Sequence, residues 1–286
     1  MSLNTLILTI IAMIAFAANS VLTRLGLLDG SIDALSFTHI RLVSAAMFLG
    51  LLVYFKTSEK ESISWDLISI ISLFGYALAF SLAYLFLPTG LGALILFSAV
   101  QFTMLGYGVI SGERPSTIQW LGITVALVGF IALLLPGASA PPSLEAALMC
   151  LSGICWGVYS LRGRHSSLDP IKRTAYNFIG TLPLVLLVLS VTFFVGPTPQ
   201  LSSNGVWLAI MSGAVTSGGG YAIWYIALRG LTATQGGVVQ LSVPVLAAVG
   251  GGIFAAEIPS IRFSLIAMVI LLGVALALWP NQQVRQ

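Results

Sequence analysis

Apolar stretches long enough to cross a lipid bilayer recur along the whole chain, separated by short segments rich in turn residues. A helix of about 20 residues spans the hydrocarbon core of a membrane. The pattern predicts an all-α integral membrane protein with ten transmembrane helices. The predicted spans are residues 3–22, 34–54, 67–87, 91–110, 118–135, 144–161, 174–195, 206–228, 234–255 and 263–279.

The scarcity of charge supports a membrane location. Charged residues make up 7% of the chain, against about 25% in soluble domains, and the mean hydropathy is +1.02. The net charge of +3 is too small and too scattered to suggest nucleic acid as a partner. Two cysteines, Cys150 and Cys155, exclude a disulfide framework. Because the first apolar stretch has no A-x-A cleavage site, we expect it to be a retained span.

The chain also contains an internal duplication. The segment Gly112-Glu113-Arg114-Pro115-Ser116 recurs as Ala256-Glu257-Ile258-Pro259-Ser260, 144 residues later. This displacement predicts two five-helix halves, residues 1–138 and 143–286, the second ending in a short C-terminal tail, with a seam at residues 137–142. An odd number of spans in each half places the second half upside down relative to the first, so the repeats are expected to be inverted around a central cavity.

Basic residues are distributed unequally between the two predicted sides of the membrane. One side carries nine Lys and Arg residues and the other carries three, and cytoplasmic loops are the ones enriched in Lys and Arg. We therefore expect both termini to lie in the cytoplasm. The nine are Lys56, Lys60, Arg114, Arg162, Arg164, Lys172, Arg173, Arg229 and Arg285, and the three are Arg24, Arg41 and Arg262.

Taken together, ten predicted spans, the duplication and the repeated Glu-x-Pro-Ser loops resemble the drug/metabolite transporter superfamily, in particular its EamA-type members. The aromatic-small pairs Phe16-Ala17 and Trp156-Gly157, the Arg of Phe37–Arg41 and the Pro of Ser242–Val245 are similar to marks of that family. The resemblance covers nearly the whole chain. It implies a multi-pass transporter of the bacterial inner membrane that exports a small-molecule substrate by alternating access and needs no cofactor. Within the family, the bacterial aromatic amino acid exporters are the nearest expectation.

Polar and aromatic side chains within the predicted spans are the candidates for the substrate site, since a polar group at membrane depth must find a partner or line a cavity. The resemblance implies a cavity lined by the first, third, fourth, sixth, eighth and ninth spans. Helix packing and interhelical hydrogen bonding are the alternative roles for these side chains. The candidates are Asn19, Tyr76, Phe80, Tyr84, Gln101, Trp156, Tyr159, Tyr221, Trp224 and Gln240. Trp65, Trp207 and Trp279 lie at span ends and are expected to be interfacial.

The Glu-x-Pro-Ser loops are expected to connect helices, with Ser capping the next helix and Glu favouring its positive end. Gating by Glu113 or Glu257 is the alternative. No Asp, Glu or Lys lies in the middle third of a span, which favours facilitated or exchange transport; weak proton coupling through His39 is the alternative. No nucleophile–base motif or metal-ligand motif supports an enzyme. The alternative functions are a multidrug or amphiphile efflux carrier and, less favoured, a lipid flippase or scramblase.

Overall fold

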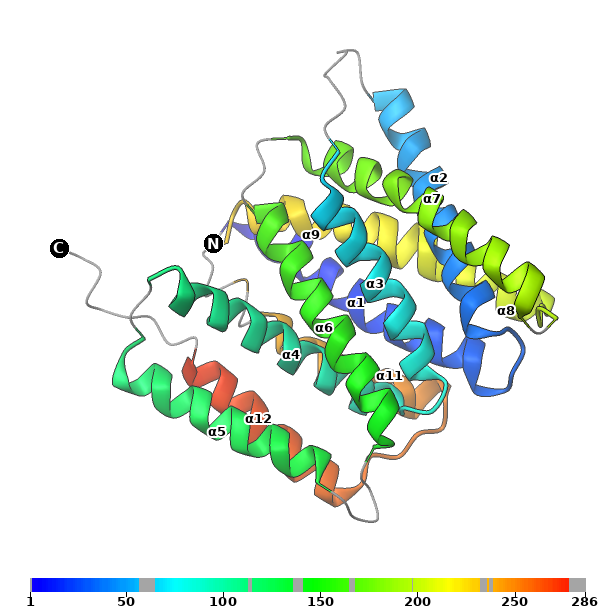
Figure 1. The fold of residues 1–286 in the computed structure, drawn as a ribbon. Helices are drawn as coiled ribbons and strands as arrows, with labels where there is room; N and C mark the ends of the chain where they lie inside the picture. Colours follow the sequence, from blue (N-terminus) through cyan, green and yellow to red (C-terminus); the bar gives the residue numbers. More distant parts are fainter. Residues whose placement is uncertain are drawn as a thin grey trace.

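The computed structural model describes residues 2–56, 65–112, 115–135, 141–164, 168–196, 198–231, 236 and 239–277. The regular structure of these residues is helical apart from one isolated bridge between Ile32 and Leu201. The helices are α1 (Leu3–Leu28), α2 (Ala34–Lys56), α3 (Leu67–Tyr84), α4 (Thr89–Ile110), α5 (Thr117–Leu134), α6 (Ser143–Arg164), α7 (Pro170–Val195), α8 (Ser203–Ile210), the π-helix η1 (Met211–Gly219), α9 (Gly220–Leu228), α11 (Ser242–Phe254) and α12 (Ile261–Ala277) (Figure 1).

Eight of the described helical segments are long and apolar enough to cross a membrane, with α8, η1 and α9 forming one continuous segment, Ser203–Leu228. The two shorter apolar helices, α11 and α12, occupy the last two predicted spans. The expected all-helical, multi-pass architecture is therefore confirmed, whereas the count of ten spans stays a prediction. Glu113, Arg114, residues 137–140 of the predicted seam and Trp279 lie outside the described residues.

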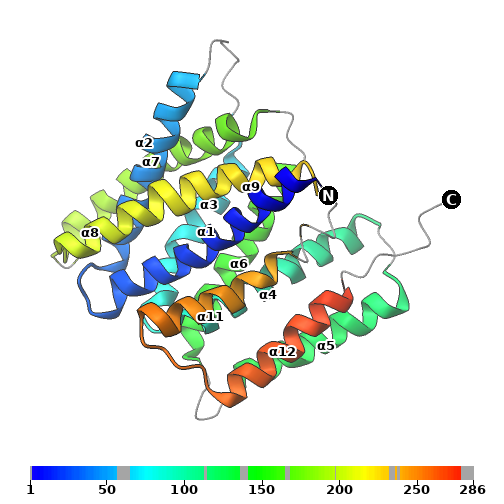
Figure 2. The same ribbon diagram turned by 180° about the vertical axis from the view of Figure 1, so that it is seen from behind.

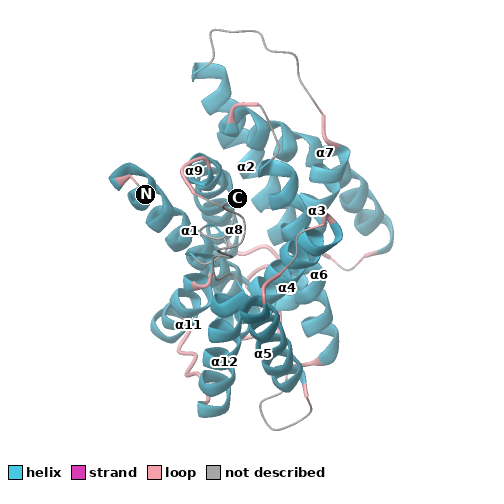
Figure 3. Ribbon diagram, turned by 90° about the vertical axis from the view of Figure 1, so that its left-hand side faces the viewer, coloured by secondary structure: helices cyan, strands magenta, loops and turns pink. Residues whose placement is uncertain are grey.

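The helices form a bundle with one pair at its margin. Helices α1 and α8–η1–α9 lie side by side through the bundle, α3 packs on α6, and α2 packs on α7 (Figure 1, Figure 2). Helix α5 packs mainly on α12, and the two form the marginal pair (Figure 3). Gly122 of α5 lies against the backbone of α12, and Gly273 of α12 against the backbone of α5, so that a side chain at either position would push the two helices apart.

Polar side chains define where several helices begin. Ser116 and Gln119 form a capping box at the start of α5, and the Ser260 hydroxyl accepts a hydrogen bond from the Phe263 N–H at the start of α12. The predicted capping role of Ser in both Glu-x-Pro-Ser loops is thus confirmed. Asp66 caps α3, and Asp169 caps α7 directly before Pro170. Local sequence therefore fixes the entry points of the helices that carry the interior side chains.

Candidate functional site

Aromatic side chains from α1, α3, α6 and α9 meet in the interior of the bundle. The Trp156 ring lies 4.6 Å from the Tyr221 ring, 5.0 Å from the Tyr76 ring and 5.5 Å from the Phe16 ring, measured between centroids. Phe16 also contacts Trp224 edge to face, at 5.7 Å. All five side chains are at most 5% exposed. Helices α1 and α3 therefore share one aromatic core with the later helices α6 and α9.

A small central cavity lies within this aromatic core. Its volume is about 10 Å³, which is about the space that one water molecule requires. The side chains themselves fill most of the interior, so this conformation leaves little room for a solute. Its lining residues are Phe16, Asn19, Ser20, Tyr76, Phe80, Leu96, Phe97, Trp156 and Tyr221.

A buried arginine adjoins the cavity. Arg41 of α2 is 1% exposed. Its Nε donates to the Ser217 hydroxyl (2.9 Å), and its Nη2 donates to the Tyr76 hydroxyl (3.0 Å) and the Tyr221 hydroxyl (2.9 Å). The guanidinium carbon lies 5.1 Å from the centroid of the Tyr76 ring and 5.0 Å from that of Phe80, within the range of cation–π attraction. The arginine thus holds two lining residues by their hydroxyl groups.

Asn19 extends the polar network to η1. Its Nδ2 donates to the Tyr76 hydroxyl (3.2 Å), while its Oδ1 accepts from Ser212 (2.7 Å) and Thr216 (3.1 Å). The Tyr221 hydroxyl donates to the Tyr76 hydroxyl (2.9 Å). Both the amide oxygen and the amide nitrogen of Asn19 are satisfied, so its side chain has a fixed orientation at the cavity wall.

The close approach of η1 to α2 depends on a glycine. Gly213 lies against the Arg41 carbonyl and the Ser44 hydroxyl, where a Cβ would collide with both. Four residues further on, Ser217 lies within hydrogen-bond distance of Arg41. The π-helical winding of residues 211–219 is a departure from α-helix that is common near functional sites. It brings Ser212, Thr216 and Ser217 toward the polar network.

One end of the bundle is tied together by an ion pair and is referred to below as the Glu257 end. Arg24 of α1 donates from Nε to Glu257 Oε1 (2.8 Å) and from Nη1 to the carbonyls of Tyr84 and Leu85. Glu257 Oε2 accepts from the Thr89 N–H at 2.6 Å. The expectation that Glu257 serves the helix that follows it was therefore wrong, since its carboxylate lies at the start of α4, whose N–H groups are equally unsatisfied.

A second contact joins loops at the same end. The Asp33 carboxylate accepts from the Gln200 N–H (3.0 Å), and the Asp33 N–H donates to the Gln200 carbonyl (3.2 Å). The Ser202 N–H donates to the Ser31 carbonyl at 2.8 Å. Hydrogen bonds from Ser36 and Gln200 outweigh the effect of burial and lower the pKa of Asp33. The connection between α1 and α2 is thus fastened to the connection between α7 and α8.

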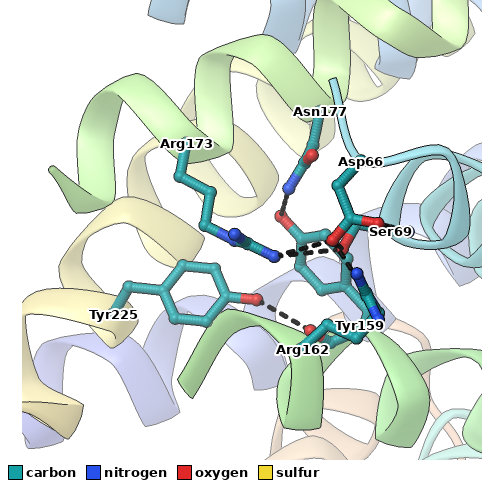
Figure 4. Close-up of polar contacts among 7 residues, drawn as sticks. All are labelled: Asp66, Ser69, Tyr159, Arg162, Arg173, Asn177 and Tyr225. Carbon is teal, nitrogen blue, oxygen red and sulfur yellow. Dashed lines mark hydrogen bonds and ion pairs between the residues drawn. The ribbon is translucent and has the colours of Figure 1, made fainter. Parts of the chain in front are cut away.

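The opposite end is tied by a carboxylate and two arginines, and is called the Asp66 end (Figure 4). Asp66 Oδ2 accepts from Arg162 Nε (2.7 Å), Arg173 Nη2 (3.1 Å) and the Ser69 hydroxyl (2.8 Å). Burial alone would raise the pKa of Asp66, but the hydrogen bonds from Arg162 and Ser69 outweigh it and lower the pKa to about 2. Asp66 precedes α3, whereas the arginines lie in α6 and α7. Contacts between early and late helices therefore join the helices at both ends of the bundle.

Larger spaces exist away from the aromatic core. A groove of about 750 Å³ runs between α11 and α12, and its lining is mostly apolar, including Leu241, Val245, Val249, Met268 and Leu272. A groove with few polar groups on the margin of a membrane protein is where lipid chains pack, and it offers little to orient a polar solute. The central cavity, with its polar network, is the better candidate for a solute site.

The structure brings together half of the residues predicted for substrate binding. Asn19, Tyr76, Phe80, Trp156 and Tyr221 line the central cavity. The other five are buried but do not line it. Tyr84 packs on Phe80 toward the Glu257 end, Tyr159 accepts from Asn177 at the Asp66 end (Figure 4), and Trp224 contacts Phe16 behind the lining. Gln101 lies within α4, and Gln240 donates to the Gly236 carbonyl.

Four further residues of the site were not predicted from the sequence, namely Arg41, Ser212, Thr216 and Ser217. The count of basic residues placed Arg41 on the outer side of the membrane, but it is the most deeply buried cation among the described residues. A signal was present, because a basic residue inside an apolar stretch is a functional candidate by default. The three hydroxyl residues lie in a Gly-rich segment that forms a π-helix. Because a π-helix has a different number of residues per turn, α-helical periodicity does not predict which of its side chains face the interior.

No group of three or more His, Cys, Asp and Glu residues that could hold a metal ion occurs in the described part of the chain. What the interior presents is aromatic faces, a guanidinium, an amide and hydroxyl groups. These groups can bind and orient a small solute between helices, and they lie between two ends that are each tied across the bundle. Such features define a multi-pass helical membrane protein with an aromatic and polar interior.

Comparison with known proteins agrees with this class. Residues 3–135 and 143–279 each match the model of the EamA-like transporter family. The chain is 47% identical to an uncharacterized protein of Pseudomonas aeruginosa (97% of this chain and 96% of the other). It is 27% identical to the uncharacterized transporter YyaM of Bacillus subtilis (82% and 81%) and 27% identical to the threonine/homoserine exporter RhtA of Escherichia coli (65% and 61%).

A solved crystal structure matches with a TM-score of 0.69 at 17% identity, covering 96% of each chain, which is a likeness of fold. The chain therefore belongs to the EamA-like transporter family of the drug/metabolite transporter superfamily. It is a multi-pass bacterial membrane protein whose relatives are transporters, and its family implies a small-molecule substrate and contact with lipid. Proteins of this family are generally not enzymes.

Proposed function

We propose that the protein exports small metabolites, in the first place amino acids with aromatic or other hydrophobic side chains, by alternating access through the central cavity. The observation that carries this proposal is the small aromatic cavity between early and late helices, with ties across the bundle at both ends. Aromatic rings offer stacking and edge contacts to planar or apolar side chains. The exporter of threonine and homoserine among its relatives supports an amino acid as the solute class.

In this proposal the chain consists of two inverted five-helix repeats, residues 1–138 and 143–286, that rock about the cavity. The two separate matches to one family model, residues 3–135 and 143–279, support the duplication. The Asp66 end faces the cytoplasm and the Glu257 end faces outside, in keeping with the uneven distribution of Lys and Arg. Breaking the contacts at one end while keeping those at the other would expose the cavity to one side at a time.

Among the candidate residues, Asn19, Tyr76, Phe80, Trp156 and Tyr221 would contact the solute directly. Tyr84, Tyr159, Trp224, Gln101 and Gln240 would contribute as the cavity widens toward either end. Because no carboxylate of the described residues lies in this interior, transport is proposed to be facilitated diffusion or exchange. Uphill transport that lasts only while a pH gradient is imposed would contradict that mechanism.

Counterflow into proteoliposomes tests the proposal. Vesicles loaded with unlabelled L-phenylalanine, L-leucine or L-threonine should accumulate the labelled form of at least one of them, and protein-free vesicles should not. Lipophilic cations and fluorescent phospholipids are assayed in the same vesicles. Movement of either one without amino acid counterflow would favour amphiphile efflux or lipid translocation instead.

A further inference from the structure

Arg41 is a buried cation without a buried anion. It lies among Tyr76, Phe80, Ser217 and Tyr221, and the hydroxyl groups that it contacts are neutral. No carboxylate of the described residues pairs with it, whereas Arg24, Arg162 and Arg173 each pair with one. A charge inside a membrane protein is costly to bury without a counter-charge, and such residues tend to mark solute pathways.

The guanidinium of Arg41 also has an unused hydrogen-bond donor. Arg41 Nη1 is buried and has no hydrogen-bond partner among the described residues. The same holds for the indole nitrogens of Trp156 and Trp224, which belong to the aromatic core beside the cavity. Indole and guanidinium N–H groups can only donate. Of the three residues, Trp156 lines the cavity and Arg41 contacts its lining residues Tyr76 and Tyr221, so unsatisfied donors beside this space indicate a ligand that accepts hydrogen bonds.

We propose that Arg41 binds the carboxylate of the transported solute. A planar carboxylate can take two parallel N–H···O bonds from a guanidinium, which gives both energy and orientation. Tyr76 and Phe80 hold the guanidinium beside the cavity, and Trp156 supplies a further donor as well as a stacking surface. The solute is thus an anion-bearing molecule with an apolar or aromatic body, and a cationic amphiphile without an acid group would leave Arg41 uncompensated.

This inference rests on the proposed amino acid export and adds a requirement for the acid group. The competing role for Arg41 is purely structural, namely to hold Tyr76 and Tyr221 in place. A structural role would make a variant lose transport of all solutes alike. It would not make the wild-type protein distinguish an acid from its amide, so the discrimination between them separates the two roles.

The first experiment uses the wild-type protein. Counterflow of labelled L-phenylalanine, L-leucine and L-threonine is measured in competition with the free acid, its amide and the corresponding amino alcohol. The free acid should compete at least ~10-fold better than either analogue, since hydrogen bonds to a charged group are at stake. Equal competition by acid and amide would overturn the inference and leave amino acid export standing. Absence of counterflow for all three solutes would overturn the proposed export and this inference with it.

The second experiment compares Arg41→Gln and Arg41→Lys with Arg229→Gln, an arginine at the end of the α9 segment that donates to the Leu168 carbonyl. Folding is first checked by the melting temperature in detergent without solute. Arg41→Gln should lose the preference for the acid, Arg41→Lys should keep part of it, and Arg229→Gln should keep all of it. A folded Arg41→Gln that still prefers the acid would contradict the inference. If Arg41→Gln does not fold, the wild-type comparison decides alone.

Discussion

Arg24 and Glu257, 233 residues apart in the chain, form an ion pair of 2.8 Å at one end of the bundle. The pair does more than join two side chains. Arg24 also holds the carbonyls of Tyr84 and Leu85 where α3 ends, and Glu257 holds the Thr89 N–H where α4 begins. One pair of residues thereby fixes α1, the α3–α4 connection and the α11–α12 connection relative to one another.

Removing one member of this pair should be costly. Both side chains are mostly buried, at 11% and 17% exposed, so Glu257→Gln leaves Arg24 without its anion. We expect the free energy of unfolding to fall by roughly 2–4 kcal/mol, measured as a lower melting temperature and denaturation midpoint in detergent. Because Glu257→Gln removes a contact at the Glu257 end, it should also increase the fraction of the protein that is open at that end during transport.

A double-mutant cycle separates the ion pair from general damage. Arg24→Met and Glu257→Gln should each destabilise, and the double variant should lose less than the sum of the two because the lost interaction is shared. Combining Glu257→Gln with Arg229→Gln at the far end of the bundle should be additive. Additive losses for Arg24→Met with Glu257→Gln would show that the two side chains do not act together.

Stability should respond to pH through Asp66 in a defined window. The folded-state pKa of Asp66 is about 2, below the ordinary value of 3.8, so the group stabilises the fold when it is ionised. This contribution is fully present above about pH 4 and is lost as the pH falls toward 2; it is at most about 2 kcal/mol. The melting temperatures of the wild type and Asp66→Asn should therefore differ by a constant amount from pH 5 to 8 and converge below pH 4. A difference that changes between pH 6 and 8 would contradict this assignment.

A side chain at position 213 should not be tolerated, because Gly213 lies in close contact with α2. Gly213→Ala places a methyl group against the Arg41 carbonyl and the Ser44 hydroxyl, which should cost about 1–3 kcal/mol and move Ser217 away from Arg41. Gly219→Ala is the matched control in the same π-helix, because a Cβ there meets neighbours only at 3.7 and 3.8 Å. We expect a lower melting temperature and weaker counterflow for Gly213→Ala alone. Equal effects of the two substitutions would mean that the close approach does not matter.

How far the sequence predicts this molecule depends on the kind of feature. The helical segments and the Ser caps follow from local patterns, since an apolar stretch in a membrane has few alternatives to a helix. Trp156, Tyr221 and Tyr76 could be proposed as interior residues because they are aromatic side chains within predicted spans. The partners of Arg41 and Glu257 could not be proposed, because each pairing joins residues brought together only by helix packing.

Glu257 shows why a contact between distant helices cannot be predicted from local sequence. Its sequence context, before Pro259 and Ser260, resembles an ordinary helix start, and Ser260 does cap α12. The carboxylate instead pairs with Arg24 of α1 and accepts a hydrogen bond from the Thr89 N–H of α4. A repeat in the sequence can locate such a loop, but the groups that surround it come from elsewhere in the fold.

The indole of Trp156 lies at the centre of the aromatic core with 2% exposure. Trp156→Phe keeps an aromatic ring but removes the second ring and the unpartnered N–H. It should lower counterflow of a hydrophobic amino acid by about fivefold or more, since about 1 kcal/mol of stacking and one hydrogen bond are lost. The melting temperature without solute should fall only modestly, because most of the packing is kept.

Trp207 provides the control, because it lies near the start of α8 with 65% of its side chain exposed. A tryptophan at the end of a membrane span serves as an interfacial anchor, so Trp207→Phe should leave counterflow within about twofold of the wild type. The loss of counterflow in Trp156→Phe is compared with the loss in Trp207→Phe, since changes in expression or reconstitution would affect both variants. Equal losses from Trp156→Phe and Trp207→Phe would place the solute path outside the aromatic core.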